Sequence, residues 1–80
     1  MNIKAFEGLE GKKISVMLNR VKSSGEPESY IAYLNSIGDG YVVLDYAKAS
    51  YDSKSNPIEQ IIMDVSVILS VWVFKETSGD

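Results

Sequence analysis

The side chains that could carry chemistry are carboxylates, lysines and tyrosines, because the chain of 80 residues contains no histidine and no cysteine. The commonest metal ligands and the usual general base near neutral pH are therefore missing. Among the eleven acidic residues, Asp39 and Asp45 lie at opposite ends of one expected strand, about 20 Å apart at the rise of a β-strand. That separation is too large for paired acid–base catalysis. We predict a protein that is not an enzyme and that needs no metal ion or cofactor.

The chain also lacks the short motifs that mark common catalytic and ligand sites. It contains no G-x-S-x-G elbow, no phosphate-binding loop and no metal-binding pattern. Its formal net charge is −3, with eight basic and eleven acidic residues, unlike the strongly basic surface of most nucleic-acid-binding domains. No apolar stretch has the length of a signal peptide or a membrane span. We predict a soluble, cytoplasmic protein that does not interact with membranes.

Lysines and tyrosines remain as candidates for binding. Lys4, Lys12 and Lys13 are close in sequence and could contact an anion, although such lysines are usually solvated. The tyrosines of the central strands and the loop after them are expected to pack within the fold or at an interface rather than to form a stacking platform. They are Tyr30, Tyr33, Tyr46 and Tyr51.

Alternation of apolar and polar residues predicts an all-β fold with a short N-terminal helix. The helix is expected at residues 2–8, and strands are expected at 12–21, 29–37, 41–47, 57–63 and 67–76. Gly, Ser and Pro predict turns at residues 22–27 and 38–40, a polar loop fills residues 48–56, and a disordered tail is expected at 77–80. We therefore predict a single domain over residues 1–80, with a five-stranded, strongly bent antiparallel small barrel over residues 9–76.

One face of the first strand is expected to lie in the core. Ile14, Val16 and Leu18 alternate with polar or flexible side chains, and alternate residues of a strand share a face. Leu9, just before the strand, is expected to join them.

The last apolar segment, VSVILSVWVF at 65–74, has apolar residues on both faces of the expected strand. A chain of this length buries only about 60–65% of the surface that its unfolded form exposes. Since no disulfide can supplement the core, oligomerisation is the expected way to cover both faces. The alternative is burial within a monomer, for example beneath a helix that packs on the sheet.

Two segments resemble the Sm and Sm-like family. Residues 9–18, LEGKKISVML, fit the pattern L-x-G-x-x-[VI]-x-V-x-L of the family's first motif, and residues 39–44, DGYVVL, are similar to a D-x-[aromatic]-V-V-L segment of its Hfq-like members. The order of a short helix and five strands matches as well. The resemblance implies an SH3-type barrel that forms a closed homo-oligomeric ring of roughly five to seven subunits, with the fourth strand of one subunit paired to the fifth of the next.

The resemblance also implies roles for particular residues. The subunit contact would be formed by Ile61, Ile62, Met63, Ile68, Ser70, Trp72 and Phe74. Single-stranded RNA would be bound at the pore-side loops and the helix–strand junction by Asp39, Tyr41, Met63, Asp64, Lys12 and Lys13. The basic element of RNA-binding members aligns near Met63 and Asp64, so an acid replaces it here. Like charges repeated around a pore repel phosphate.

Two functions therefore stay open from the sequence. The first is a ring that binds RNA by base stacking on Tyr41. The second is a structural or protein-interaction ring without RNA. Asp39 and Tyr41 each have a simpler explanation, because aspartate between glycines forms turns and a tyrosine at an interface places its hydroxyl at the rim.

Overall fold

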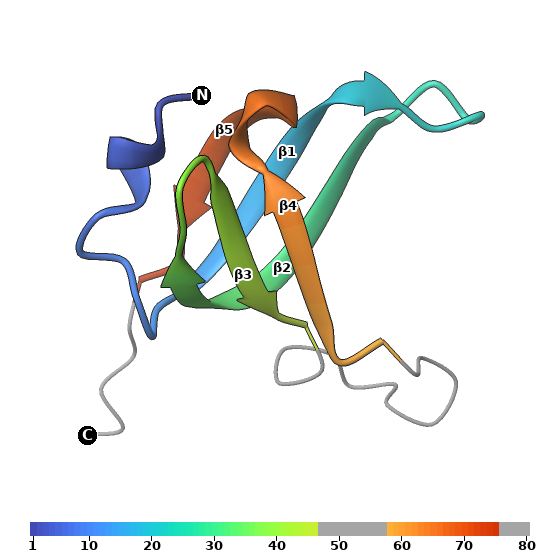
Figure 1. Cartoon of the computed structure of the whole chain (residues 1–80). Helices are drawn as coiled ribbons and strands as arrows, with labels where there is room; N and C mark the ends of the chain where they lie inside the picture. The colour runs from blue at the N-terminus through green and yellow to red at the C-terminus, as the bar shows by residue number, and fades with distance from the viewer. Residues whose placement is uncertain (47–57, 76–80) are drawn as a thin grey trace.

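The structure is a computed structural model that describes residues 1–46 and 58–75. The all-β prediction is confirmed, because five antiparallel strands form one sheet (Figure 1). In chain order the elements are the 3-10 helix η1 (Ile3–Phe6), β1 (Lys13–Val21), β2 (Pro27–Ile37), β3 (Tyr41–Asp45), β4 (Gln60–Asp64), the 3-10 helix η2 (Val65–Val67) and β5 (Ile68–Val73). The predicted loop at 48–56, the strand start at Pro57, Tyr51, the strand end at residue 76 and the tail at 77–80 lie outside the described residues.

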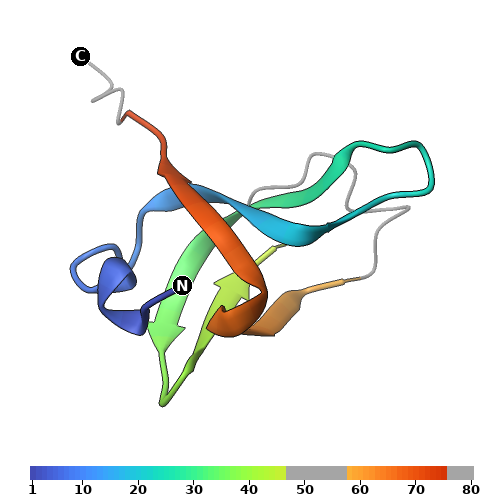
Figure 2. The same ribbon diagram turned by 90° about the horizontal axis from the view of Figure 1, so that it is seen from above.

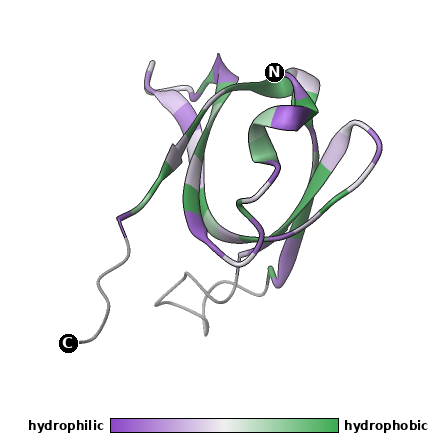
Figure 3. Cartoon of the chain, turned by 90° about the vertical axis from the view of Figure 1, so that its left-hand side faces the viewer, coloured by the Kyte–Doolittle hydropathy of each residue, from purple (hydrophilic) through white to green (hydrophobic). Residues whose placement is uncertain are grey.

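The strands follow the order β4-β3-β2-β1-β5, so β4 and β5 form the two edges of the sheet. The sheet curls around a common interior (Figure 3). The short helix η2 joins β4 to β5 and lies near one end of each edge (Figure 1). Within the described residues, β4 and β5 do not pair with each other, and the sheet is open. The finer prediction of a closed barrel is therefore not confirmed.

Glycines permit the two tight turns that shape the central hairpins. In the β1–β2 turn, Gly25 has a φ of 91°, and the N–H of Lys22 donates to the carbonyl of Glu26 at 2.8 Å. In the β2–β3 turn, Gly40 has a φ of 84°, a conformation that favours glycine. The β1–β2 hairpin extends as an arm away from the rest of the sheet (Figure 2).

The core lies on the concave face of the curled sheet. The predicted core residues of β1 are confirmed, since Ile14 and Val16 are 0% exposed and Leu18 is 1% exposed. Leu9 is half-buried and packs against them. The core is completed by Phe6, Ala32, Leu34, Val42, Leu44, Met63, Val65 and Ile68.

The last strand departs from strict alternation at Leu69. Met17 pairs with Ser70, but the next residue, Leu18, pairs with Ile68, so Leu69 is an extra residue in β5. Such a bulge changes which face the following side chains occupy. Ile68 is consequently buried at 2% exposure, whereas Leu69 is 62% exposed. Ile68 and Trp72, which the resemblance places together in the subunit contact, therefore lie on opposite faces of β5.

Candidate functional site

The β2–β3 turn and the β4–η2 junction meet at one end of the sheet. Tyr41 pairs with Asp64 across β3 and β4, and the N–H of Val65 donates to the carbonyl of Gly40 at 3.0 Å. Asp39, in the same turn, is exposed. The structure thus brings together three of the predicted site residues, an aromatic ring and two carboxylates.

Tyr41 lies against the backbone of Gly38. A Cβ atom placed on Gly38 would be only 2.1 to 2.5 Å from three carbons of the Tyr41 ring, which is closer than any side chain tolerates. The N–H of Gly38 also donates to the carbonyl of Tyr41 at 2.8 Å. Tyr41 is nevertheless 42% exposed. One side of the ring is therefore covered by glycine, while much of the ring stays accessible to a planar ligand.

Asp64 has a structural role that explains an acid at this position. Its carboxylate accepts a hydrogen bond from the Ser66 N–H at 2.9 Å and so caps η2. Caps of this kind satisfy a backbone donor that the first helical turn leaves free. The bonds from the backbone and side chain of Ser66 lower the pKa of the Asp64 carboxyl, and the ammonium group of Met1 lowers it further. Asp64 is therefore a stable negative charge beside Tyr41.

The structure does not gather all six residues predicted to bind RNA. Met63 is 7% exposed and belongs to the core, because it faces Val42 across the buried side of β4. Its assignment to the RNA site is therefore wrong. Lys13 pairs with Tyr33, which precedes the end of β2 by four residues, or about 13 Å at strand rise. Lys12 and Lys13 thus lie at a distance from the Tyr41 loop along the sheet.

Lys13 is instead part of an aromatic surface on the outer side of the sheet. Its Nζ atom lies 5.4 Å from the centre of the Phe74 ring, within the range of a cation–π contact. Two residues further along β1, on the same face, Ser15 pairs with Ile31 of β2 and with Trp72 of β5. The Nε1 atom of Trp72 donates to the Ser70 hydroxyl at 3.1 Å.

The residues predicted for the subunit contact divide between the core and the two edge strands. Met63 and Ile68 are buried in the core, so their side chains are not available to a neighbouring subunit. Ile61 and Ser70 are half-buried. Ile62 is 69% exposed, Trp72 is 62% exposed and Phe74 is 42% exposed. Leu69 and Val73, at 62% and 48% exposure, are apolar edge residues that the sequence prediction missed.

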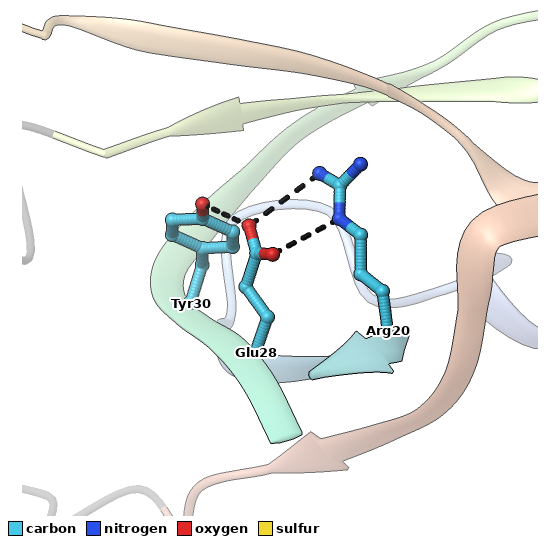
Figure 4. Close-up of polar contacts among 3 residues, drawn as sticks. All are labelled: Arg20, Glu28 and Tyr30. Carbon is cyan, nitrogen blue, oxygen red and sulfur yellow. Dashed lines mark hydrogen bonds and ion pairs between the residues drawn. The ribbon is translucent and has the colours of Figure 1, made fainter. Parts of the chain in front are cut away.

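A polar cluster on the β1–β2 hairpin was not predicted. Arg20 donates from Nε to the Glu28 carboxylate at 3.0 Å, and the Tyr30 hydroxyl donates to the same carboxylate (Figure 4). The Tyr30 ring also contacts Tyr46 edge-on, with ring centres 6.1 Å apart. Glu28 and Tyr30 are two residues apart on one strand and so share a face, a signal that could have suggested this pair. The cluster links β1 and β2 where the β1–β2 arm begins.

This cluster predicts a specific loss of stability at high pH. The hydrogen bond to Glu28, together with burial, raises the pKa of Tyr30. A phenol with a raised pKa in the folded chain stabilises the fold below its unfolded value of about 10, and this contribution disappears as the pH rises through the folded value. We expect the free energy of unfolding to fall more steeply in the native chain than in Tyr30→Phe as the pH rises above about 10.

Urea titrations of both proteins at several pH values measure that difference. Tyr30→Phe should also make the free energy of unfolding less dependent on pH in the acid range, because the Tyr30 hydroxyl, together with Arg20, lowers the pKa of the Glu28 carboxyl. A depressed carboxyl pKa stabilises the fold above its unfolded value of about 4.3, and the gain is lost as the pH falls through the folded value. Parallel curves for the two proteins at both extremes would show that the cluster has no such role.

A second polar cluster connects β2, β3 and β4. The Asp45 carboxylate accepts hydrogen bonds from Asn35 at 3.0 Å and from Gln60 at 2.9 Å. Asp45 is thus engaged in cross-strand bonding. In the described parts of the chain, no group of three or more acidic side chains could hold a metal ion, and no helix is both long and apolar enough to cross a membrane.

Comparison of the chain with protein-family models, with curated proteins and with solved structures finds no match. The site itself is therefore the basis for a functional proposal. The Tyr41 end of the sheet offers an exposed tyrosine with Asp64 beside it and Asp39 in the same turn. Separately, the two open sheet edges carry exposed apolar side chains.

Proposed function

We propose that this protein is a self-assembling structural or protein-interaction module of the Sm-like type, in which copies pair edge to edge into a closed ring. The observation that carries the proposal is the pair of unpaired edges, β4 and β5, with their exposed apolar side chains. An open edge is a template for pairing with another chain. Neither β4 nor β5 contains a proline that would block that pairing.

In a closed ring, one type of contact pairs both open edges of every copy. When the β4 edge of each copy meets the β5 edge of the next, a heterologous contact forms, and such contacts close into rings if the rotation allows it. The Sm-like resemblance at residues 9–18 and 39–44 and the curled five-stranded sheet support the same arrangement and a barrel completed in the assembly. The outer face and loops would then be available to protein partners.

Light scattering coupled to size-exclusion chromatography tests this proposal. At micromolar concentration we expect one multimeric species with a mass several times the 8.8 kDa of the chain. A single stable monomer across that concentration range would refute self-assembly.

A second candidate function is single-stranded RNA binding at the Tyr41 loop. The observation that favours it is the exposed Tyr41 ring held against Gly38, because a fixed aromatic ring loses little freedom when a base stacks on it. The flanking carboxylates of Asp39 and Asp64 and the distance of Lys13 from the loop weigh against phosphate contacts. The self-assembling module without RNA is therefore favoured.

RNA binding has a sharp test in two substitutions. If bases stack on Tyr41, Tyr41→Ala should weaken binding of a short oligonucleotide by about 1–3 kcal/mol. Asp64→Arg should strengthen binding, most clearly at low salt, because it replaces a negative charge with a positive one. Fluorescence anisotropy with labelled oligo-U and oligo-A measures both effects.

Glu26→Arg is the matched control for charge, because Glu26 is exposed on the β1–β2 arm. Equal strengthening by Glu26→Arg and Asp64→Arg would indicate non-specific attraction. If the native protein binds neither oligonucleotide at low salt while Asp64→Arg does, RNA binding is not a function of the native chain.

A further inference from the structure

We propose that the assembly uses one antiparallel register, in which Ile62 of β4 lies opposite Val73 of β5 in a second copy of this chain. This inference rests on the proposed self-assembly and specifies its contact. It follows from the direction of the free backbone groups, from the exposure of the side chains beside them and from the match between the two edges.

The hydrogen bonds of β4 determine which of its residues face the open edge. The carbonyl of Glu59 and the N–H of Val65 both bond on the β3 side, each at 3.0 Å. Backbone groups of successive residues point to opposite sides of a strand. Therefore the groups directed to the open edge belong to Gln60, Ile62 and Asp64, whose side chains lie on the outer face of the sheet, since Ile62 pairs with Val43 rather than with a core residue.

The hydrogen bonds of β5 give the complementary result. The N–H of Phe74 donates to the carbonyl of Lys13 in β1 at 3.1 Å, so the backbone of Trp72, two residues earlier, also faces β1. The groups of Val71 and Val73 are then directed to the open edge. Their side chains lie on the core face, because they pair with Val16 and Ile14.

An antiparallel contact brings edge-directed residues of the two strands opposite each other, with their side chains on one face. The outer face of β4 must therefore continue into the core face of β5 in the next copy. This geometry accounts for the 48% exposure of Val73. Val73 belongs to a core face that the single chain leaves open, and Ile62, at 69% exposure, is the apolar side chain that would cover it.

The register is selected by matching side chains along both edges. With Ile62 opposite Val73, the apolar Ile61 lies opposite Phe74, and Trp72 lies opposite the buried position of Met63. The polar side chain of Gln60 then faces Lys75, and only Asp64, opposite Val71, is mismatched. Cross-strand pairs of like polarity are the ones that stabilise a sheet.

The neighbouring registers match poorly. A shift of two residues in one direction places Gln60 opposite Val73 and Asp64 opposite Leu69. The opposite shift places Ile62 opposite Lys75 and Asp64 opposite Val73. Each shift therefore sets polar or charged groups against exposed apolar ones.

Pairing of like edges is also less suitable. A β4–β4 contact would leave the half-exposed core face at Val73 open, and a β5–β5 contact would leave Ile62 exposed. In a parallel β4–β5 contact, the outer face of β4 would continue into the outer face of β5, and Ile62 would lie beside Trp72. Ile62 would then not cover the core face at Val73. The antiparallel β4–β5 contact is the one that covers both exposed residues with a single interface.

Disulfide cross-linking tests the register cleanly, because the native chain has no cysteine. Ile62→Cys and Val73→Cys are prepared as separate variants, refolded together and oxidised. Opposite residues of an antiparallel pair have Cα atoms about 5.5 Å apart or less, which a disulfide can bridge. We expect a covalent dimer on a non-reducing gel from the mixture, at least tenfold more abundant than from either variant alone.

The controls report the alternative contacts. Ile62→Cys mixed with Val71→Cys or with Trp72→Cys should cross-link poorly, since the first pair is shifted along the strand by about 6.6 Å and the second lies on opposite faces. Ile61→Cys with Phe74→Cys is a second pair that the register places opposite each other and that should cross-link. Light scattering under reducing conditions verifies that each mixture assembles.

The outcomes separate this inference from the proposed function. Assembled mixtures that cross-link preferentially at 62 with 71, at 62 with 72, or from Ile62→Cys alone would overturn the register while self-assembly stands. The same holds if assembled mixtures give no cross-link at either predicted pair. A native chain that is monomeric by light scattering would overturn both.

Discussion

Replacing Leu18 with alanine is expected to lower the free energy of unfolding by about 2–4 kcal/mol, the usual range for truncation of a buried leucine. Leu18 is 1% exposed and lies on the core face of β1, where it pairs with the buried Ile68 of β5. The cavity would open beneath the bulge at Leu69, next to Met17, which pairs with Ser29 of β2 and with Ser70 of β5. The surrounding chain can therefore collapse only partly. Urea or guanidinium unfolding at one fixed protein concentration measures the loss.

Two valines of the same strand provide a matched control. Val16 is 0% exposed, whereas Val21 is 65% exposed at the base of the arm. Val16→Ala should destabilise the protein clearly, while Val21→Ala should change its stability by less than about 0.5 kcal/mol. Similar losses in both variants, or a loss below about 0.5 kcal/mol for Leu18→Ala, would mean that the core is not organised around this face of β1.

Much of the fold could be predicted from the sequence because the strands near the N-terminus alternate strictly. Ile14, Val16 and Leu18 follow a period of two without interruption, and Gly38 and Gly40 mark the central turn. The predicted bounds agree with the observed β1 and β2 and with the start of β3 to within about two residues, and the predicted end at residue 47 lies outside the described residues. In this half of the chain the alternating pattern agrees with the tertiary packing. Whether a side chain is buried or exposed can therefore be predicted from its place in the pattern.

The last strand could not be predicted correctly by alternation. A bulge depends on how two strands fit together, and the segment 65–74 is apolar on both faces, so its pattern does not reveal the extra residue at Leu69. The misplacement of Ile68 follows directly from that bulge. Whether the sheet closes could not be predicted from the sequence either, because closure depends on whether β4 and β5 pair within one chain or between chains.

The candidate site was predictable only where sequence neighbours are also spatial neighbours. Asp39 and Tyr41 belong to one turn, so their proximity could be predicted. Asp64 joins them through strand pairing, and its capping of η2 depends on the short helix that follows it. The bond between Arg20 and Glu28 depends on the register across a hairpin turn, which shifts between Met17 and Val21. Pairing of this kind cannot be read from spacing alone.

The largest effect on the proposed assembly is expected from Trp72→Asp, which should convert the proposed multimer to a folded monomer. Trp72 is 62% exposed, or roughly 150 Å² for a side chain of about 250 Å². If that area is buried against a second copy, it contributes about 3–4 kcal/mol per contact at about 25 cal/mol per Å², which corresponds to more than about a 100-fold change in the association constant. An aspartate at the same place also brings an unpaired charge into the contact, which adds to the loss.

Ile62→Lys, on the opposite edge strand, should have the same effect, because Ile62 is 69% exposed on β4 and covers the other side of the proposed contact. Val21→Asp is the matched control, since Val21 is 65% exposed on the arm, away from both edges, and its substitution should leave the mass unchanged. Light scattering gives the mass of each variant, and circular dichroism shows whether the chain stays folded. If Trp72→Asp and Ile62→Lys remain multimeric, or if only Val21→Asp dissociates, the copies meet through another surface. Ile68→Lys is unsuitable for this purpose, because a lysine at a site with 2% exposure would unfold the chain before it could report on assembly.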